Sequence, residues 1–181
     1  MTPSSTPPSR HDLDPASTTT ADRDLYRSLS SYTAKGVGVI SAVSRGWDFA
    51  ATVTAYLSVS YDPPTLLVSL YRDGRLAEAL EEAGEWALSI VSAEQKDAVQ
   101  WLAEPGNPLH GLLKPVPHFR PTDGGPVVLS GSLAWYQART VAVHEAATHL
   151  LFVGEVTSMG QAKGPDSRAL VRYGSDYRAF Q

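Results

Sequence analysis

Hydroxyl side chains occupy every second position of segment 52–61, a spacing that could serve ligand binding. The segment alternates polar Thr52, Thr54, Tyr56, Ser58 and Ser60 with apolar Val53, Ala55, Leu57, Val59 and Tyr61. A period of two predicts a β-strand with one polar face and one apolar face that points inward. Hydroxyl groups on such a face can donate and accept hydrogen bonds to a flat heteroaromatic ring or a phosphate. A polar face that is merely exposed to solvent is the alternative interpretation.

Two arginines mark a second candidate site. Arg72 and Arg75 flank Asp73 and Gly74, directly before a predicted helix over 75–83. Free N–H groups and the helix dipole at a helix start favour an anion, and guanidinium groups pair well with phosphate. Two solvated arginines are the alternative, and the Asp73 carboxylate could cap the helix itself and repel a phosphate.

The stretch from His144 to His149 reads HEAATH and resembles a zinc-protease motif only superficially. The motif H-E-x-x-H places its two histidines four residues apart on one helical face. A spacing of five residues instead corresponds to about 140° around a helix, and the flanking sequence predicts strands. His149 alone remains a candidate, at the start of a predicted strand, with a structural or exposed histidine as the alternative.

Other common catalytic motifs are missing from the sequence. It has no cysteine, which excludes thiol chemistry and disulfides, and it has no G-x-S-x-G nucleophile motif. Gly36 and Gly38 begin like a dinucleotide-binding motif, but Ser41 stands where its third glycine would be and the segment enters a strand. Any redox chemistry therefore requires a bound organic cofactor that is not held by a Rossmann unit.

Length and charge narrow the class of protein. The chain has 181 residues, which suits one domain, and a formal net charge of -4. That charge gives no basic footprint for nucleic acid, and no apolar run is long enough to cross a membrane. Residues 1–22 are rich in Ser, Thr and Pro and lack the apolar core of a signal peptide. We expect a disordered tail over 1–22, one domain over 23–181 and a cytoplasmic location.

Short strands dominate the expected elements. A helix over 22–35 is expected to bury Leu25, Leu29 and Tyr32 on one face, and a capping box of Ser92 and Gln95 predicts a helix to about Ala103. Strands are expected over 37–43, 52–61, 65–71, 85–91, 127–129, 132–137, 139–144 and 150–158. This pattern favours a mainly β fold, a closed antiparallel or Greek-key barrel with a few helices, over a doubly wound sheet.

A longer string carries a resemblance to a known family. Residues 52–64 read TVTAYLSVSYDPP and are followed by LLVSL at 66–70. This string resembles the signature of the short-chain flavin reductase family, which has an FMN-binding split-barrel fold. Further resemblances lie at 83–91, 92–103, 125–133, 149–156 and 173–177, so that the likeness runs from about Leu25 to Phe180.

The resemblance implies a homodimeric NAD(P)H:flavin oxidoreductase. It implies FMN or FAD as the flavin, NADH or NADPH as the co-substrate, and a partner monooxygenase that receives the reduced flavin. It assigns flavin contact to Thr52, Val53, Thr54, Ala55, Ser58, Ser60, Ser69, Tyr71, Arg72 and Arg75. It assigns dinucleotide contact to His149, Gly174 and Tyr177, with His149 nearest the reaction.

Several positions depart from the family pattern. Thr54 replaces the usual Asn, Asp73 and Leu76 replace the hydroxyl residues of the phosphate turn, and Thr148 replaces the Asp before the histidine. These departures favour a second hypothesis, a flavoprotein that retains FMN or FAD and turns over little NAD(P)H. A split barrel that binds another flat ligand is a third hypothesis. The sequence leaves open the choices between FMN and FAD and between NADH and NADPH.

Overall fold

The computed structural model describes residues 10–13, 16–104, 106–107, 111–161 and 167–180, and strands dominate it. The helices in this part of the chain are α1 (Thr20–Ser30), α2 (Arg75–Ala83) and α3 (Lys96–Ala103), with a short 3-10 turn over Ala93–Gln95. The expected capping box is present, since Ser92 and Gln95 bond reciprocally before α3. The prediction of a mainly β fold with a few helices is confirmed.

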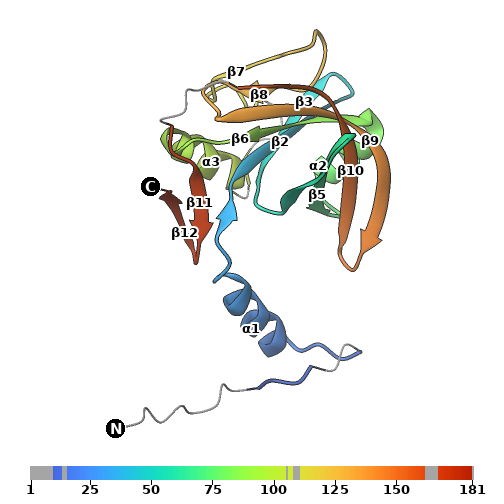
Figure 1. The fold of residues 1–181 in the computed structure, drawn as a ribbon. Coiled ribbons are helices and arrows are strands. Elements are labelled where there is room, and N and C mark those ends of the chain that lie inside the picture. The colour runs from blue at the N-terminus through green and yellow to red at the C-terminus, as the bar shows by residue number, and fades with distance from the viewer. Residues whose placement is uncertain (1–9, 14–15, 105, 108–110, 162–166, 181) are drawn as a thin grey trace.

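Seven antiparallel strands form the central sheet (Figure 1). In sheet order they are β3 (Trp47–Val53), β2 (Gly38–Ser44), β6 (Glu85–Ile90), β9 (Ala134–Ala146), β10 (His149–Gly160), β5 (Pro64–Tyr71) and β4 (Tyr56–Tyr61). A second sheet joins β1 (Lys35–Gly36), β11 (Leu170–Tyr173) and β12 (Asp176–Ala179), and β7 (His118–Phe119) pairs with β8 (Val128–Leu129).

The expected closed barrel is not found. The hydrogen-bonded order ends at β3 on one side and at β4 on the other, and these two strands do not pair in the described part of the chain. Yet only Thr54 and Ala55 separate the end of β3 from the start of β4. Because two residues span so short a distance, the sheet must curl until its two edges approach each other at this corner.

The predicted single strand over 52–61 is wrong in two respects. The strand breaks at Thr54 and Ala55, and a register shift lies between Ser58 and Ser60, so the alternation does not describe one continuous face. Its apolar side is also not turned inward throughout, because Leu57 and Val59 are 51% and 50% exposed. The separate strands expected over 132–137 and 139–144 are one strand, β9.

The core lies on the concave side of the sheet. Leu66, Val68 and Leu70 of β5 alternate inward, and Trp86 and Phe152 fill the space between β5, β6 and β10. A second apolar cluster lies under α3 and includes Val37, Val99 and Leu129. β2 is buried along almost its whole length, as the sequence predicted for segment 37–43.

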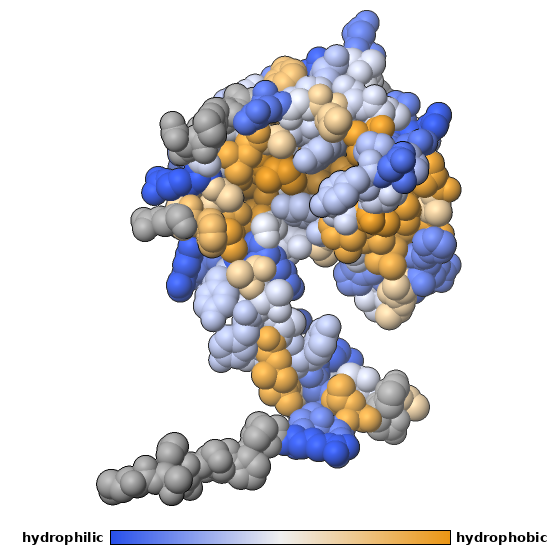
Figure 2. Space-filling model, viewed as in Figure 1, coloured by the Kyte–Doolittle hydropathy of each residue, from blue (hydrophilic) through white to orange (hydrophobic). Residues whose placement is uncertain are grey.

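Helix α1 stands away from the sheet, as the ribbon shows (Figure 1). None of its residues is buried, and Leu25, Leu29 and Tyr32 are exposed, which corrects the expectation of one buried face. The Gly174 N–H donates to the Ser31 carbonyl at 3.0 Å and ties the end of the helix to the β11–β12 hairpin. Apolar side chains of the helix are visible at its surface (Figure 2).

The predicted tail over 1–22 overlaps this helix, because α1 begins at Thr20 with Thr19 as its cap. Residues 1–9 and 14–15 of that tail lie outside the described residues. No helix in the part of the chain that the structure describes is long and apolar enough to cross a membrane.

Candidate functional site

The break between β3 and β4 opens a cavity of about 310 Å³, here called the corner cavity. Thr54 and Ala55 form its edge, β5 supplies one wall, and the first turn of α2 supplies another. Six predicted flavin contacts line it, namely Thr52, Val53, Thr54, Ala55, Ser69 and Tyr71. Residues from the β3–β4 corner, β5 and α2 therefore meet around one cavity.

The start of α2 offers backbone donors to the corner cavity. Gly74 is the N-cap and makes no side-chain cap hydrogen bond, and Gly74, Leu76 and Ala77 line the cavity. The first N–H groups of a helix have no partner within the helix, and the helix dipole adds positive potential there. An anionic group in the cavity would find its donors in this backbone rather than in an arginine side chain.

The two predicted phosphate-binding arginines lie elsewhere. Arg72 donates to the Glu145 carboxylate at 3.1 Å and to the Ala147 carbonyl, so it braces the β9–β10 turn. Arg75 lines a separate groove together with Glu78 and Glu82. Neither arginine lines the corner cavity, because the turn after β5 directs Arg72 to the neighbouring hairpin and Arg75 lies on another face of α2.

Ser58 and Ser60 also lie outside the corner cavity. Ser58 is exposed on β4, and Ser60 exchanges hydrogen bonds with the Asp62 backbone at 3.0 and 3.1 Å. Both lie beyond the strand break, so the structure does not bring them together with the six residues that line the corner cavity. The Thr52 hydroxyl donates to the Val99 carbonyl at 2.8 Å, which ties β3 to α3.

Tyr71 and His149 lie side by side on β5 and β10. They are paired in register, and their rings meet edge to face with centroids 5.9 Å apart. The hydrogen bond between the Tyr71 hydroxyl and Asp73 raises the pKa of Tyr71. The Thr148 hydroxyl lies 3.0 Å from His149 Nδ1, so the imidazole has a polar neighbour where the family pattern has an Asp.

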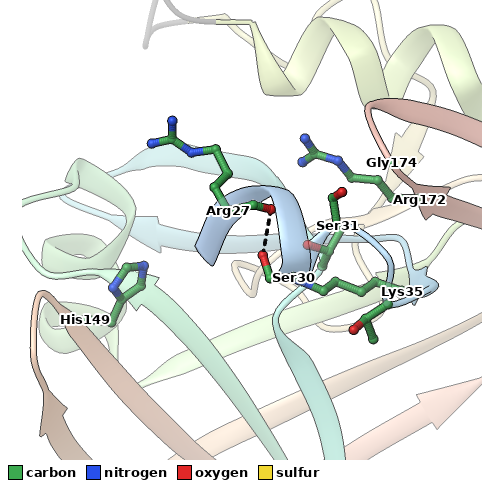
Figure 3. A pocket seen from close by; sticks show the side chains of 9 residues that line it. Arg27, Ser30, Ser31, Lys35, His149, Arg172 and Gly174 are labelled. Atoms are coloured by element: carbon green, nitrogen blue, oxygen red, sulfur yellow. Dashed lines mark hydrogen bonds between the residues drawn. The ribbon is translucent and has the colours of Figure 1, made fainter. Parts of the chain in front are cut away.

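A larger cavity of about 510 Å³ adjoins the first, and we call it the basic cavity (Figure 3). Thr54 lines both cavities, which makes it the point where they meet. His149 and Gly174, two of the three predicted dinucleotide contacts, line the basic cavity. The third, Tyr177, lies outside the lining and packs against the core cluster under α3, with Arg172 6.0 Å from its ring centroid.

Three cationic residues of the basic cavity were missed by sequence reasoning. Arg27 comes from α1, Lys35 from β1 and Arg172 from β11. In the close view, Arg172 extends toward Arg27, and Lys35 extends toward Ser30 (Figure 3). No local motif joins these positions, because β1–β11 pairing and the tether of α1 bring them together.

Comparison with known proteins decides the family. Residues 29–181 match the model of the flavin reductase like domain. The chain belongs to the flavin reductase-like family. The resemblance drawn from segment 52–64 is thereby confirmed, and the corner cavity lies in the part of this flavin reductase-like domain that carries that string.

Curated relatives and solved structures agree with this membership. NADH-dependent FMN reductase AsuE2 of Streptomyces nodosus subsp. asukaensis is 30% identical over 166 residues, covering 87% of this chain and 84% of the relative. FMN reductase (NADH) SmoA of Agrobacterium fabrum is 30% identical over 142 residues, 78% of each chain. The structure of BorF, the flavin reductase component of a bacterial two-component tryptophan halogenase, matches with a TM-score of 0.80 at 26% identity, covering 87% of this chain and 98% of BorF.

Proposed function

We propose that this flavin reductase-like chain is an NADH- or NADPH-dependent oxidoreductase that reduces FMN or FAD. The observation that carries the proposal is the junction of two cavities at Thr54, one lined by the family's flavin string and the other by His149 and Gly174. Relatives named as NADH-dependent FMN reductases support the same activity.

The corner cavity suits a flavin by its chemistry. Val53, Leu70 and Leu76 give it apolar walls for a flat ring system, and Thr54 and Ala55 form its edge, where the Ala55 carbonyl accepts from the Ser69 N–H at 2.9 Å. The unoccupied N–H groups at the start of α2 suit the flavin phosphate. Arg72 and Arg75 are not needed for this arrangement, although their part in phosphate binding stays a prediction.

Hydride transfer between nicotinamide and flavin depends on the alignment of the two rings more than on an acid or a base. Flavin and nicotinamide would supply the hydride chemistry between C4 and N5 when both are bound, and the protein's share would be to align the rings and exclude water. Thr54 lies where the two ligands would meet, and His149 with Tyr71 borders that point. Tyr71 lines the flavin side and His149 lines the nicotinamide side.

We extend the proposal to the assembly and the partner. Leu25, Tyr26 and Leu29 on α1 and Leu57 and Val59 on β4 are exposed apolar side chains, which supports a homodimer that covers them. The curated relatives include the reductase subunit HsaB of a flavin-dependent monooxygenase, which supports delivery of reduced flavin to a monooxygenase. The curled sheet supports the split-barrel form, and a cytoplasmic location stays a prediction from sequence.

A flavin titration followed by a turnover assay tests the function. We expect FMN or FAD fluorescence to be quenched at micromolar protein, and NADH or NADPH to be consumed when free flavin is added. A protein that is purified yellow, binds flavin tightly and oxidises neither dinucleotide would instead support the flavoprotein that retains its cofactor. The absence of any flavin binding would reject both.

A further inference from the structure

Two cations face each other across neighbouring strands. Lys35 of β1 is the direct register partner of Arg172 in β11, so their side chains leave the sheet on the same face. Like charges at directly opposed positions destabilise a sheet. Lys35 is half-buried, whereas Arg172 is exposed and its guanidinium lies 6.0 Å from the Tyr177 ring centroid, so water screens part of this repulsion. An anion bound between Lys35 and Arg172 would offset this electrostatic repulsion.

A third cation faces the same space. Arg27 lines the basic cavity from the end of α1, and the hydroxyl residues Ser30 and Ser31 lie beside it. Among the described residues that line this cavity none is acidic. The partner of Arg27, Asp24, lies 3.1 Å away in an exposed pair, which holds the guanidinium only weakly. The cavity therefore presents three positive charges, of which Arg27 alone has a carboxylate partner among the ion pairs of the described residues.

The rest of the cavity lining lies where the basic cavity meets the corner cavity. Thr54 and His149 line the same cavity, and Thr54 also borders the corner cavity. A ligand whose ring reaches Thr54 would extend the rest of its length toward Lys35 and Arg172. A volume of about 510 Å³ lies within the usual range for sites that bind small ligands.

We propose that Lys35 and Arg172, assisted by Arg27, bind a phosphate group of the nicotinamide dinucleotide. This inference rests on the proposed reductase function and adds to it the residues that select the co-substrate. Arginine offers a planar fork of donors to phosphate, and lysine adds a point charge. The phosphate is either the pyrophosphate shared by NADH and NADPH or the 2′-phosphate found in NADPH alone. With no carboxylate in the cavity lining to repel it, NADPH is accepted at least as readily as NADH.

The test compares three hydride donors that share the dihydronicotinamide ring and carry different phosphate groups or none. The variants Lys35→Gln and Arg172→Gln are assayed with NADH, with NADPH and with N-benzyl-1,4-dihydronicotinamide, a hydride donor without phosphate. We expect kcat/KM for a dinucleotide, divided by that for the benzyl compound, to fall roughly 10- to 100-fold in each variant. Equal falls for NADH and NADPH identify the pyrophosphate, and a fall confined to NADPH identifies the 2′-phosphate.

Arg178→Gln is the matched control. Arg178 lies on the same hairpin but on the opposite face from Arg172, since it is in register with Val171, and it pairs with Asp176 at 3.4 Å. In this variant the ratio of kcat/KM for a dinucleotide to that for the benzyl compound should match the wild-type ratio. A second readout is thermal unfolding without ligand, which Lys35→Gln should leave unchanged or raise because the repulsion is relieved.

Unchanged ratios in both variants, with normal turnover of NADH and of the benzyl compound, would overturn the phosphate site and leave the reductase function intact. A wild-type protein that reduces flavin with none of the three donors would instead reject the reductase function itself. A ratio that falls equally in Arg178→Gln would also overturn the assignment, since the effect would then be one of general surface charge.

Discussion

Tyr71 and His149 meet edge to face, with ring centroids 5.9 Å apart and ring planes at 74°. The two residues belong to different cavities, since Tyr71 lines the corner cavity and His149 lines the basic cavity. Their register pairing across β5 and β10 fixes this contact within the sheet. The pair is therefore a boundary between the proposed flavin and dinucleotide sites, and it gives the first prediction.

Replacing His149 should affect the dinucleotide more than the flavin. We expect His149→Ala to raise KM for NADH or to slow flavin reduction by less than about 100-fold, because ring alignment matters more here than proton transfer. Flavin affinity should change little. Stopped-flow reduction of the flavin-loaded protein at several NADH concentrations measures both the binding of NADH and the rate of flavin reduction. Thr148→Val, which removes the hydroxyl 3.0 Å from Nδ1, should have a smaller effect of the same kind. Unchanged kinetics at every NADH concentration would make His149 a structural residue.

The flavin phosphate should respond to Asp73 and not to Arg75. Asp73 lies directly before the start of α2, so its charge opposes a phosphate held by the N–H groups there. Asp73→Asn should tighten FMN by about two- to fivefold and leave riboflavin, which lacks the phosphate, unchanged. Arg75→Ala should alter neither ligand by more than roughly twofold, as befits an exposed surface charge. Fluorescence titrations of both ligands give the comparison, and a large loss of FMN alone in Arg75→Ala would restore the arginine as the phosphate ligand.

Oligomeric state should depend on the apolar side of α1. Leu29→Asp places a charge among side chains that we expect the second copy to cover, and it should shift the protein from dimer to monomer. Thr20→Asp is the control, since exposed position 20 lies on the other side of the helix from Leu29 and the variant introduces the same charge. Sedimentation velocity distinguishes the two forms. A wild-type protein that is monomeric at micromolar concentration would contradict the homodimer.

A methyl group at position 154 should destabilise the core. A Cβ atom on Gly154 would lie 2.5 Å from Cζ2 of buried Trp86 and 3.0 Å from the Ala138 Cβ. Overpacking of this kind costs about 1–3 kcal/mol, so Gly154→Ala should lower the free energy of unfolding by that amount in a urea titration. Adding Trp86→Phe removes the clashing ring, and the double variant should be more stable than the sum of the two single losses implies. If the two losses of unfolding free energy simply add, the Trp86 ring is not the group that the new methyl group contacts.

The cap of α1 should fail only in strong acid. Asp22 bonds to the Thr19 side chain and to His11, and these bonds, the Thr19 bond first, lower the pKa of Asp22 from 3.8 to about 2. A lowered pKa means that the carboxylate stabilises the helix fully above its unfolded value and loses this effect as pH falls from about 4 toward 2. The amide resonance of Thr19, which donates to Asp22, should titrate with a midpoint near 2. A midpoint at the ordinary value of 3.8 would contradict the cap, and Asp22→Asn should abolish the titration.

Local features of the fold were within reach of the sequence. The strand over 65–71, the capping box of Ser92 and Gln95 and the helix over 75–83 were all predicted. Gly84 adopts φ 66°, a left-handed conformation that glycine reaches without strain, so its place in the sequence marks the helix end. Each of these signals acts over a few residues, which is why the printed sequence suffices. The string at 52–64 likewise pointed to the family, which the match over residues 29–181 confirms.

Tertiary structure alone decided where the binding groups meet. The break at Thr54 and Ala55 follows from the curl of a seven-stranded sheet, and no local pattern marks it. Pairing of β1 with β11 sets Lys35 against Arg172, although 136 residues lie between them in the chain. Arg72 was predicted to face a phosphate, but a hairpin some 70 residues further along the chain supplies its partner Glu145. Charges and cavities depend on which distant strands become neighbours, and that choice is made by the burial of the whole core rather than by any one segment.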